Sequence, residues 1–121
     1  MIQFNGQTLA YIGDAIYELR VREHFLSKGH TLVNDLHQKV IKLTSANGQI
    51  IALEKIQDML SLEEQQIIKR GRNAESSRKP KHTRMQDYKY ATGFEALIGY
   101  LYLSNQIERL NVVLNLVLDC E

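Results

Sequence analysis

The sequence predicts an all-α fold, a single helical bundle, and three observations support this prediction. Apolar residues recur at spacings of three and four along most of the chain, whereas the alternating pattern of strands is almost absent. A length of 121 residues fits one domain with one hydrophobic core, so residues 1–121 are treated as a single domain. The only proline lies in the one long stretch without apolar periodicity, at about residues 71–86.

Glycine separates the first two predicted helices. Helical periodicity runs from about residue 7 to residue 26 and ends near Gly29, which suits the left-handed position after a helix. Thr31 is the candidate N-cap of the second helix. The apolar positions of that helix are spaced by four, four and three residues, at Leu32, Leu36, Val40 and Leu43.

Four further helical segments are expected. A third helix carries a comparable apolar stripe, made by Ile50, Leu53, Ile56 and Leu60. Ser61 and Glu64 have the spacing of a capping box, which opens a short fourth helix. The last two helices are expected at about residues 87–103 and 105–119. The main stripe of the former consists of Phe94, Leu97, Ile98 and Leu101.

The segment of about residues 71–86 is expected to be a basic loop. Loops of this length inside a compact domain are often functional. Between residues 69 and 84 seven basic residues accompany one acidic residue, a local charge of +6. The rest of the chain carries −5, although the net charge is only +1. Such separation of charge in one small domain indicates a polyanionic partner at the basic segment.

Two acidic residues lie inside apolar helical stretches, among small residues. On the first helix Asp14 points away from the stripe made by Leu9, Ile12, Ile16 and Leu19. On the later helix Glu95 sits at the margin of the main stripe, beside Ala91, Thr92 and Gly99. Another helix or a ligand can approach closely on such a face, but a partly buried charge needs a partner or a cation. For either acid taken alone, an ordinary salt bridge is the alternative.

Several classes of protein are not favoured. Cys120 is the single cysteine, so no intrachain disulfide is possible and a reducing compartment is expected. No segment resembles a signal peptide or reaches transmembrane length, which predicts a cytoplasmic protein without a membrane partner. The histidines lack the spacing of a zinc site, and neither a serine or cysteine nucleophile with its base nor a glycine-rich phosphate loop is recognisable.

The motif Gly13-Asp14-Ala15, followed far downstream by the run from Phe94 to Leu103, resembles the ribonuclease III catalytic domain. More narrowly, the chain resembles Mini-ribonuclease III, the bacterial form without a double-stranded-RNA-binding domain. The segment from Arg70 to Ala74 is also similar to that subfamily. The resemblance covers nearly the whole chain and implies a ribonuclease III endonuclease-domain-like helical bundle.

The resemblance also implies an activity and a site. It implies a homodimeric, magnesium-dependent endonuclease, with Mn²⁺ as a possible substitute, that cuts both strands of an RNA duplex and matures large-subunit ribosomal RNA precursors. Asp14 and Glu95 would be the catalytic residues and the metal ligands. The RNA-binding residues are expected in and beside the basic loop, at Arg70, Arg72, Arg78, Lys79, Lys81, His82 and Arg84.

Three departures from ordinary ribonuclease III concern acidic residues. This chain has Ala10 and Thr92 where the larger enzymes carry a glutamate and an aspartate, and Ala74 near the place of another glutamate. The number of metal ions, one or two, is therefore open, and water is expected to complete the octahedral shell that magnesium demands.

Phosphodiester hydrolysis by carboxylate-held magnesium is also the simplest enzyme chemistry that the residues allow. The first alternative is a non-catalytic helical module that binds RNA or a ribosome-processing partner. The second, a purely structural protein, leaves the basic loop and the two acids unexplained. A duplex has local two-fold symmetry, which favours a two-fold homodimer. The interface is expected to include Tyr11, Tyr17 and Leu36.

Overall fold

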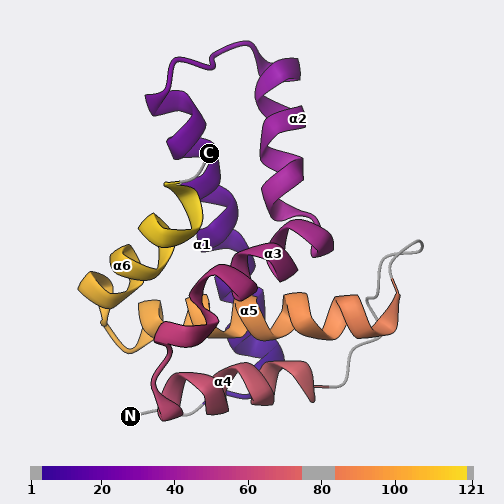
Figure 1. Cartoon of the computed structure of the whole chain (residues 1–121), viewed down its shortest axis with the longest axis vertical. Helices are drawn as coiled ribbons and strands as arrows, with labels where there is room; N and C mark the ends of the chain where they lie inside the picture. Colours follow the sequence, from indigo (N-terminus) through magenta and orange to yellow (C-terminus); the bar gives the residue numbers. More distant parts are fainter. Residues whose placement is uncertain (1–3, 75–83, 120–121) are drawn as a thin grey trace.

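The computed structural model describes residues 4–74 and 84–119, which form six α-helices and one short 3-10 helix, with no strand among them (Figure 1). The elements are α1 (Gly6–Ser27), α2 (Val33–Thr44), α3 (Ala46–Ile56), η1 (Gln57–Met59), α4 (Leu62–Arg72), α5 (Met85–Leu103) and α6 (Ile107–Leu118). The all-α fold class is confirmed. Within the described ranges, no helix is both long enough and apolar enough to cross a bilayer.

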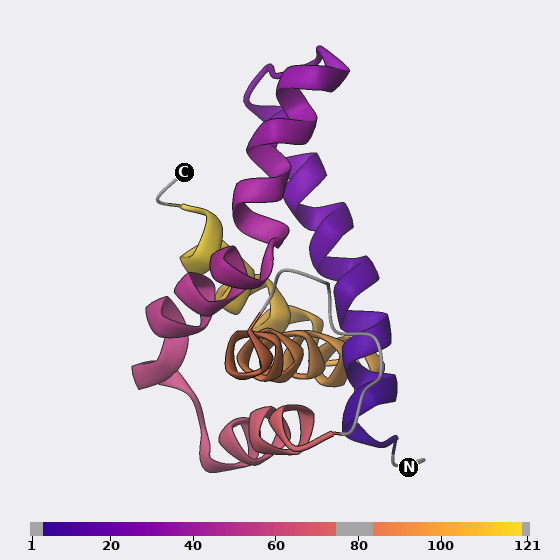
Figure 2. The same cartoon turned by 90° about the vertical axis from the view of Figure 1, so that its right-hand side faces the viewer.

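Helix α5 is the centre of the bundle. Figure 2 shows α5 almost end-on, with α4 beneath it and α1 passing beside it. Helix α1 makes its most extensive contacts with α5, and α4, α3 and α6 also pack on α5. The C-terminal half of α1 and the antiparallel α2 form a hairpin that extends away from α5 (Figures 1 and 2).

The apolar stripe predicted for the fifth helix forms the middle of the core. Its members Phe94, Leu97, Ile98 and Leu101 have no exposed surface. The Tyr17 ring of α1 meets the Phe94 ring edge to face, with the ring centroids 5.0 Å apart. Because α5 is covered on several sides, its charged residues can lie only where a neighbouring helix leaves room.

Two of the three predicted helix-end signals are confirmed, and one is wrong. Gly29 has φ of 93° just after α1, and Ser61 and Glu64 form both bonds of the capping box at α4. The cap predicted at Thr31 is wrong, because Leu32 occupies the N-cap position of α2 and provides no side-chain hydrogen bond. Leu32 is therefore exposed rather than part of the core stripe.

The basic loop is shorter than expected at both ends. Helix α4 continues to Arg72 and α5 begins at Met85, so the connection comprises residues 73–84. Of these, residues 75–83 lie outside the described part of the chain. The third helix also ends early, at Ile56, and η1 carries the chain on to the buried Leu60.

The buried face of α1 is shifted from the predicted stripe: Leu9 is buried and Ile16 packs against the core, but Leu19 lies outside it. Leu19 is 57% exposed, whereas Gly13, Tyr17 and Val21 are buried. The small residues face α5 because they allow its backbone to approach closely. Tyr17 has no exposed surface, so its predicted place in a dimer interface is wrong.

Candidate active site

Two glycines bring α1 and α5 into backbone contact. A Cβ atom at Gly13 would overlap the carbonyl oxygen of Glu95, and a Cβ atom at Gly99 would overlap the carbonyl oxygen of Leu9. Any larger residue at either position would force the helices apart, because backbone atoms cannot yield as a flexible side chain can. The small-residue faces seen in the sequence are therefore the two sides of one helix crossing.

This crossing brings together the two predicted catalytic residues. Asp14 follows Gly13 and is exposed, while Glu95 is largely covered by its neighbours. Burial, the hydrogen bond with Asp14 and the charge of Asp14 together raise the pKa of Glu95 to about 9. Without a cation, Glu95 is therefore protonated at neutral pH, beside Asp14.

A third residue of the site was missed by the sequence analysis. Gln49, near the start of α3, is only 3% exposed. Its Nε2 donates to Oε2 of Glu95 at 3.2 Å and to the carbonyl oxygen of Thr44 at 3.0 Å. Gln49 is 46 residues from Glu95 and belongs to no recognised motif, so only the packing of α3 on α5 reveals the contact.

The site has the chemical character of a divalent-cation site. A buried carboxyl beside a second carboxyl is unfavourable when both are ionised, and a bound cation relieves that repulsion. Carboxylate oxygens are also the ligands that magnesium prefers. Among the described residues, no histidine, cysteine or further acid joins the pair to form a group of three.

The two positions that carry acids in the larger enzymes are occupied by packed side chains. Ala10 is buried in a small apolar cluster with Leu9, Ile67 and Ala96. Thr92 is also buried, and its hydroxyl donates to the carbonyl oxygen of Tyr88 at 2.8 Å. Neither position carries a carboxylate, so among the described residues the crossing offers a cation the two carboxylates of Asp14 and Glu95.

The start of the basic segment packs against the same part of α5. A Cβ atom at Gly71 would lie 2.7 Å from Cβ of Ala96 and 2.9 Å from the carbonyl oxygen of Thr92. The end of α4 therefore contacts the turn of α5 that contains Glu95. The next residue, Arg72, lies over the Tyr90 ring, with 4.2 Å between the guanidinium carbon and the ring centroid.

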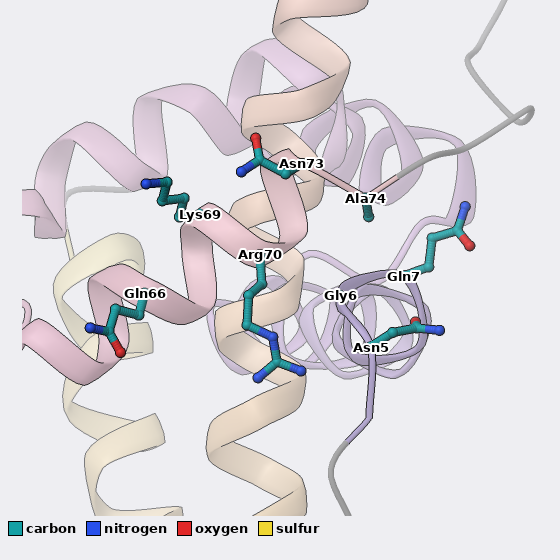
Figure 3. A pocket seen from close by; sticks show the side chains of 8 residues that line it. All are labelled: Asn5, Gly6, Gln7, Gln66, Lys69, Arg70, Asn73 and Ala74. Carbon is teal, nitrogen blue, oxygen red and sulfur yellow. The ribbon is translucent and has the colours of Figure 1, made fainter.

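Three of the predicted RNA-binding residues lie in the described part of the chain, and each contacts a protein group. Arg70 donates to the carbonyl oxygen of Phe4, Arg72 donates to the Tyr90 hydroxyl at 3.3 Å, and Arg84 pairs with Asp87 at 3.3 Å. Figure 3 shows Arg70 in a cleft of about 710 Å³ between α4 and the start of α1. The other predicted residues, Arg78, Lys79, Lys81 and His82, lie outside the described residues.

Comparisons with known proteins agree with this arrangement. Residues 7–106 match the ribonuclease III domain. The chain is 47% identical to the Mini-ribonuclease 3 of Clostridium tetani, over 97% of this chain and 78% of that protein. It is 46% identical to the Mini-ribonuclease 3 of Thermoanaerobacter sp. strain X514, over 96% and 82% respectively.

A solved structure shares the fold. The crystal structure of a Fusobacterium nucleatum protein superposes with a TM-score of 0.88 at 32% identity, and the match covers 98% of this chain and 91% of that one. The match to the ribonuclease III domain spans both Asp14 and Glu95. This chain therefore belongs to the ribonuclease III family, and within it to the Mini-ribonuclease 3 group of endoribonucleases.

Proposed function

We propose that this endoribonuclease cleaves double-stranded RNA with Mg²⁺ as its cofactor, for which Mn²⁺ can substitute. The observation that carries the proposal is the pairing of Asp14 with Glu95 at the glycine crossing of α1 and α5. Two adjacent carboxylates, one of them partly buried, repel each other when both are ionised, and a bound cation relieves that repulsion. Family membership supplies the reaction that such a pair serves.

Asp14 and Glu95 have distinct parts in this proposal. Exposed Asp14 faces the solvent from which a cation and RNA arrive, whereas Glu95 forms the covered side of the site. Together they would hold Mg²⁺, which when bound makes an attacking water more acidic and stabilises charge on the leaving oxygen. Because holding a cation requires the ionised carboxylate, Glu95 must release its proton as the site fills.

The basic segment is the proposed contact for the RNA backbone. Its first residues pack one turn from the acid pair, so phosphates bound there would lie near the site. Duplex RNA hides its base edges in a deep, narrow groove, so recognition should depend on shape and backbone contact. Replacing Arg78, Lys79, Lys81 and Arg84 with alanine should lower the slope of log affinity against log salt, because each lost phosphate contact reduces counterion release.

The active form is proposed to be a two-fold homodimer. One chain contributes one acid pair, whereas a duplex has two antiparallel backbones, and a closed dimer supplies the second site. Exposed apolar side chains of α1 are available for an interface: Tyr11 is 69% exposed, and Leu19 and Leu26, seven residues apart on one face, are 57% and 49% exposed. Leu36 is partly buried against the core, and its place in an interface stays a prediction. Sedimentation at micromolar concentration tests this state.

The substrate is proposed to be the precursor of large-subunit ribosomal RNA, which places the enzyme in the cytoplasm. The motifs and the family membership support this assignment. Mapping the cleavage sites on a structured ribosomal precursor tests the substrate and the activity together. Cleavage confined to simple duplexes, with the precursor left intact, would contradict the ribosomal assignment.

The activity is tested with an end-labelled RNA duplex and its separated strands. We expect Mg²⁺-dependent cleavage of both strands of the duplex and none of the single strands. Chelation of the cation should stop cleavage and leave binding measurable. Tight duplex binding without cleavage in Mg²⁺ or Mn²⁺ would instead favour a non-catalytic RNA-binding module.

A further inference from the structure

Gln49 of α3 donates a side-chain hydrogen bond to Glu95, across 46 residues of sequence. We propose that Gln49 is a positioning residue, which holds the Glu95 carboxylate in the orientation that captures the divalent cation. This inference depends on the proposed function, because it assigns a role at the same site. It concerns a residue that supplies no ligand atom itself but acts through Glu95.

The orientation of the Gln49 amide follows from its partners. Both groups within reach, Oε2 of Glu95 and the carbonyl oxygen of Thr44, are acceptors. Only the NH₂ end of the amide can satisfy them, and a flipped amide would place oxygen against oxygen. The hydrogen bond to Thr44 fixes the Gln49 amide relative to the end of α2. The hydrogen bond to Glu95 in turn restricts the orientation of the Glu95 carboxylate.

The burial of Gln49 strengthens the case for a role at the site. Gln49 Oε1 is buried and has no hydrogen-bond donor among the described residues. An unpaired buried acceptor destabilises the folded protein, because it has lost its hydrogen bonds to water. An apolar side chain of the same length would have no unpaired acceptor, so core packing alone does not explain why residue 49 is a glutamine. The donated bond to Glu95 does explain it.

Helix α4 contains a matched control. Gln65 Nε2 donates to the carbonyl oxygen of Leu60 at 3.1 Å, and Gln49 Nε2 donates to that of Thr44 in the same way, five residues back in both cases. Gln65 is exposed, and its described hydrogen bond reaches no carboxylate. Gln65→Met therefore removes the same backbone contact without touching the site.

The test measures Mn²⁺ binding to the purified full-length protein, without RNA, by electron paramagnetic resonance of free Mn²⁺. Gln49→Met keeps the side-chain length but cannot donate a hydrogen bond. We expect its Mn²⁺ affinity to fall roughly tenfold or more, as for other residues that orient metal ligands. Gln65→Met should bind Mn²⁺ as the wild type does, and saturating Mn²⁺ should restore most duplex cleavage to Gln49→Met.

Wild-type affinity in Gln49→Met would overturn the proposal. An equal loss of Mn²⁺ affinity in Gln65→Met would also overturn it, because the loss would then follow from the missing backbone hydrogen bond at a helix end rather than from the bond to Glu95. If Gln49→Met does not unfold cooperatively, Gln49→Asn replaces it, since its shorter amide cannot span the distance to Glu95. Failure of the proposed function gives a different result: wild type itself would not bind Mn²⁺, or Glu95→Gln would bind it unchanged.

Discussion

Glu64 is buried and Glu95 is partly buried, and the charged neighbours of these two glutamates are opposite in sign. Glu64, at the start of α4, is 5% exposed and receives Arg109 on both oxygens, at 2.7 and 2.8 Å. The hydrogen bonds from Arg109 lower the pKa of Glu64, whereas burial and Asp14 raise the pKa of Glu95 to about 9. Arg109 therefore neutralises the charge of Glu64, whereas the charged neighbour of Glu95 is a second acid, Asp14.

This contrast indicates that Glu64 has a structural role, whereas Glu95 is available to bind a cation. The Glu64–Arg109 pair joins α4 to α6 and also reaches the carbonyl oxygen of Met59 through Arg109, so its hydrogen bonds are complete. The Asp14–Glu95 pair has no cationic side chain among its described contacts. No side chain of the described residues balances its charge as Arg109 balances that of Glu64, so the two glutamates should respond oppositely to substitution.

The largest expected difference between substitutions at the two glutamates is in the rate of RNA cleavage. Asp14→Asn and Glu95→Gln keep the side-chain shape but remove a charge needed to hold the cation. Lewis-acid stabilisation by a metal is worth several kcal/mol, so the cleavage rate should fall roughly a thousandfold or more. Glu64→Gln serves as the control and should keep wild-type cleavage wherever it remains folded. Wild-type cleavage by either site variant at saturating Mg²⁺ would remove that residue from the site.

The next effect is on stability and is confined to the structural pair. Arg109→Met leaves Glu64 buried without its partner, which should lower the free energy of unfolding by about 3 kcal/mol. Urea denaturation measures this loss. Cation binding should be unaffected, because Arg109 contacts Glu64 and Met59 rather than the acid pair. An unchanged unfolding midpoint would show that the pair is not the structural anchor inferred here.

A smaller effect concerns Glu95 in the cation-free protein. Its pKa rises from 4.5 to about 9 on folding, so the folded protein retains a proton that the unfolded chain releases above pH 4.5. Stability should therefore fall as pH rises from 4.5 toward 9. In a chelating buffer at pH 8, Glu95→Gln should be more stable than wild type by at least about 1 kcal/mol, and the difference should vanish near pH 5.

The contribution of Glu64 to stability should depend on pH in the opposite direction. Its folded pKa lies below 4.5, so its stabilising contribution is present above pH 4.5 and disappears as pH falls through the folded value. Unfolding of Glu64→Gln and wild type across pH 3–7 measures this contribution. A difference that grew on acidification would contradict the assignment of Glu64 as an ionised partner of Arg109.

Much of the fold follows from local sequence chemistry, but the buried face of α1 does not. Apolar periodicity located the helices, and the Ser61 capping box and Gly29 marked helix ends correctly. The large residues of α1 indicated a stripe through Leu19, yet Leu19 is exposed and the buried face is shifted toward Gly13 and Tyr17. Contact between Gly13 and α5 is a property of two helices together, so periodicity within one helix cannot reveal it.

The site was predictable to the extent that its residues have unusual local surroundings. Asp14 and Glu95 stood out as acids among small residues, and the structure brings them together. Gln49 has no unusual neighbours in the sequence. It contacts Glu95 only because α3, after the turn from α2, packs on α5. Tyr17 was predicted at an interface as an apolar side chain left over after the bundle closes, but the packing of α1 on α5 places it in the core.

Proton release on cation binding tests the central claim most directly. Isothermal titration of Mn²⁺ into wild-type protein at pH 7.5, in buffers of different ionisation enthalpy, counts the protons released. Because Glu95 is protonated without a cation and must ionise to bind one, we predict a release close to one proton for wild type and none for Glu95→Gln. Tight Mn²⁺ binding without proton release, or release that persists unchanged in Glu95→Gln, would contradict the assignment of this pair as the cation site.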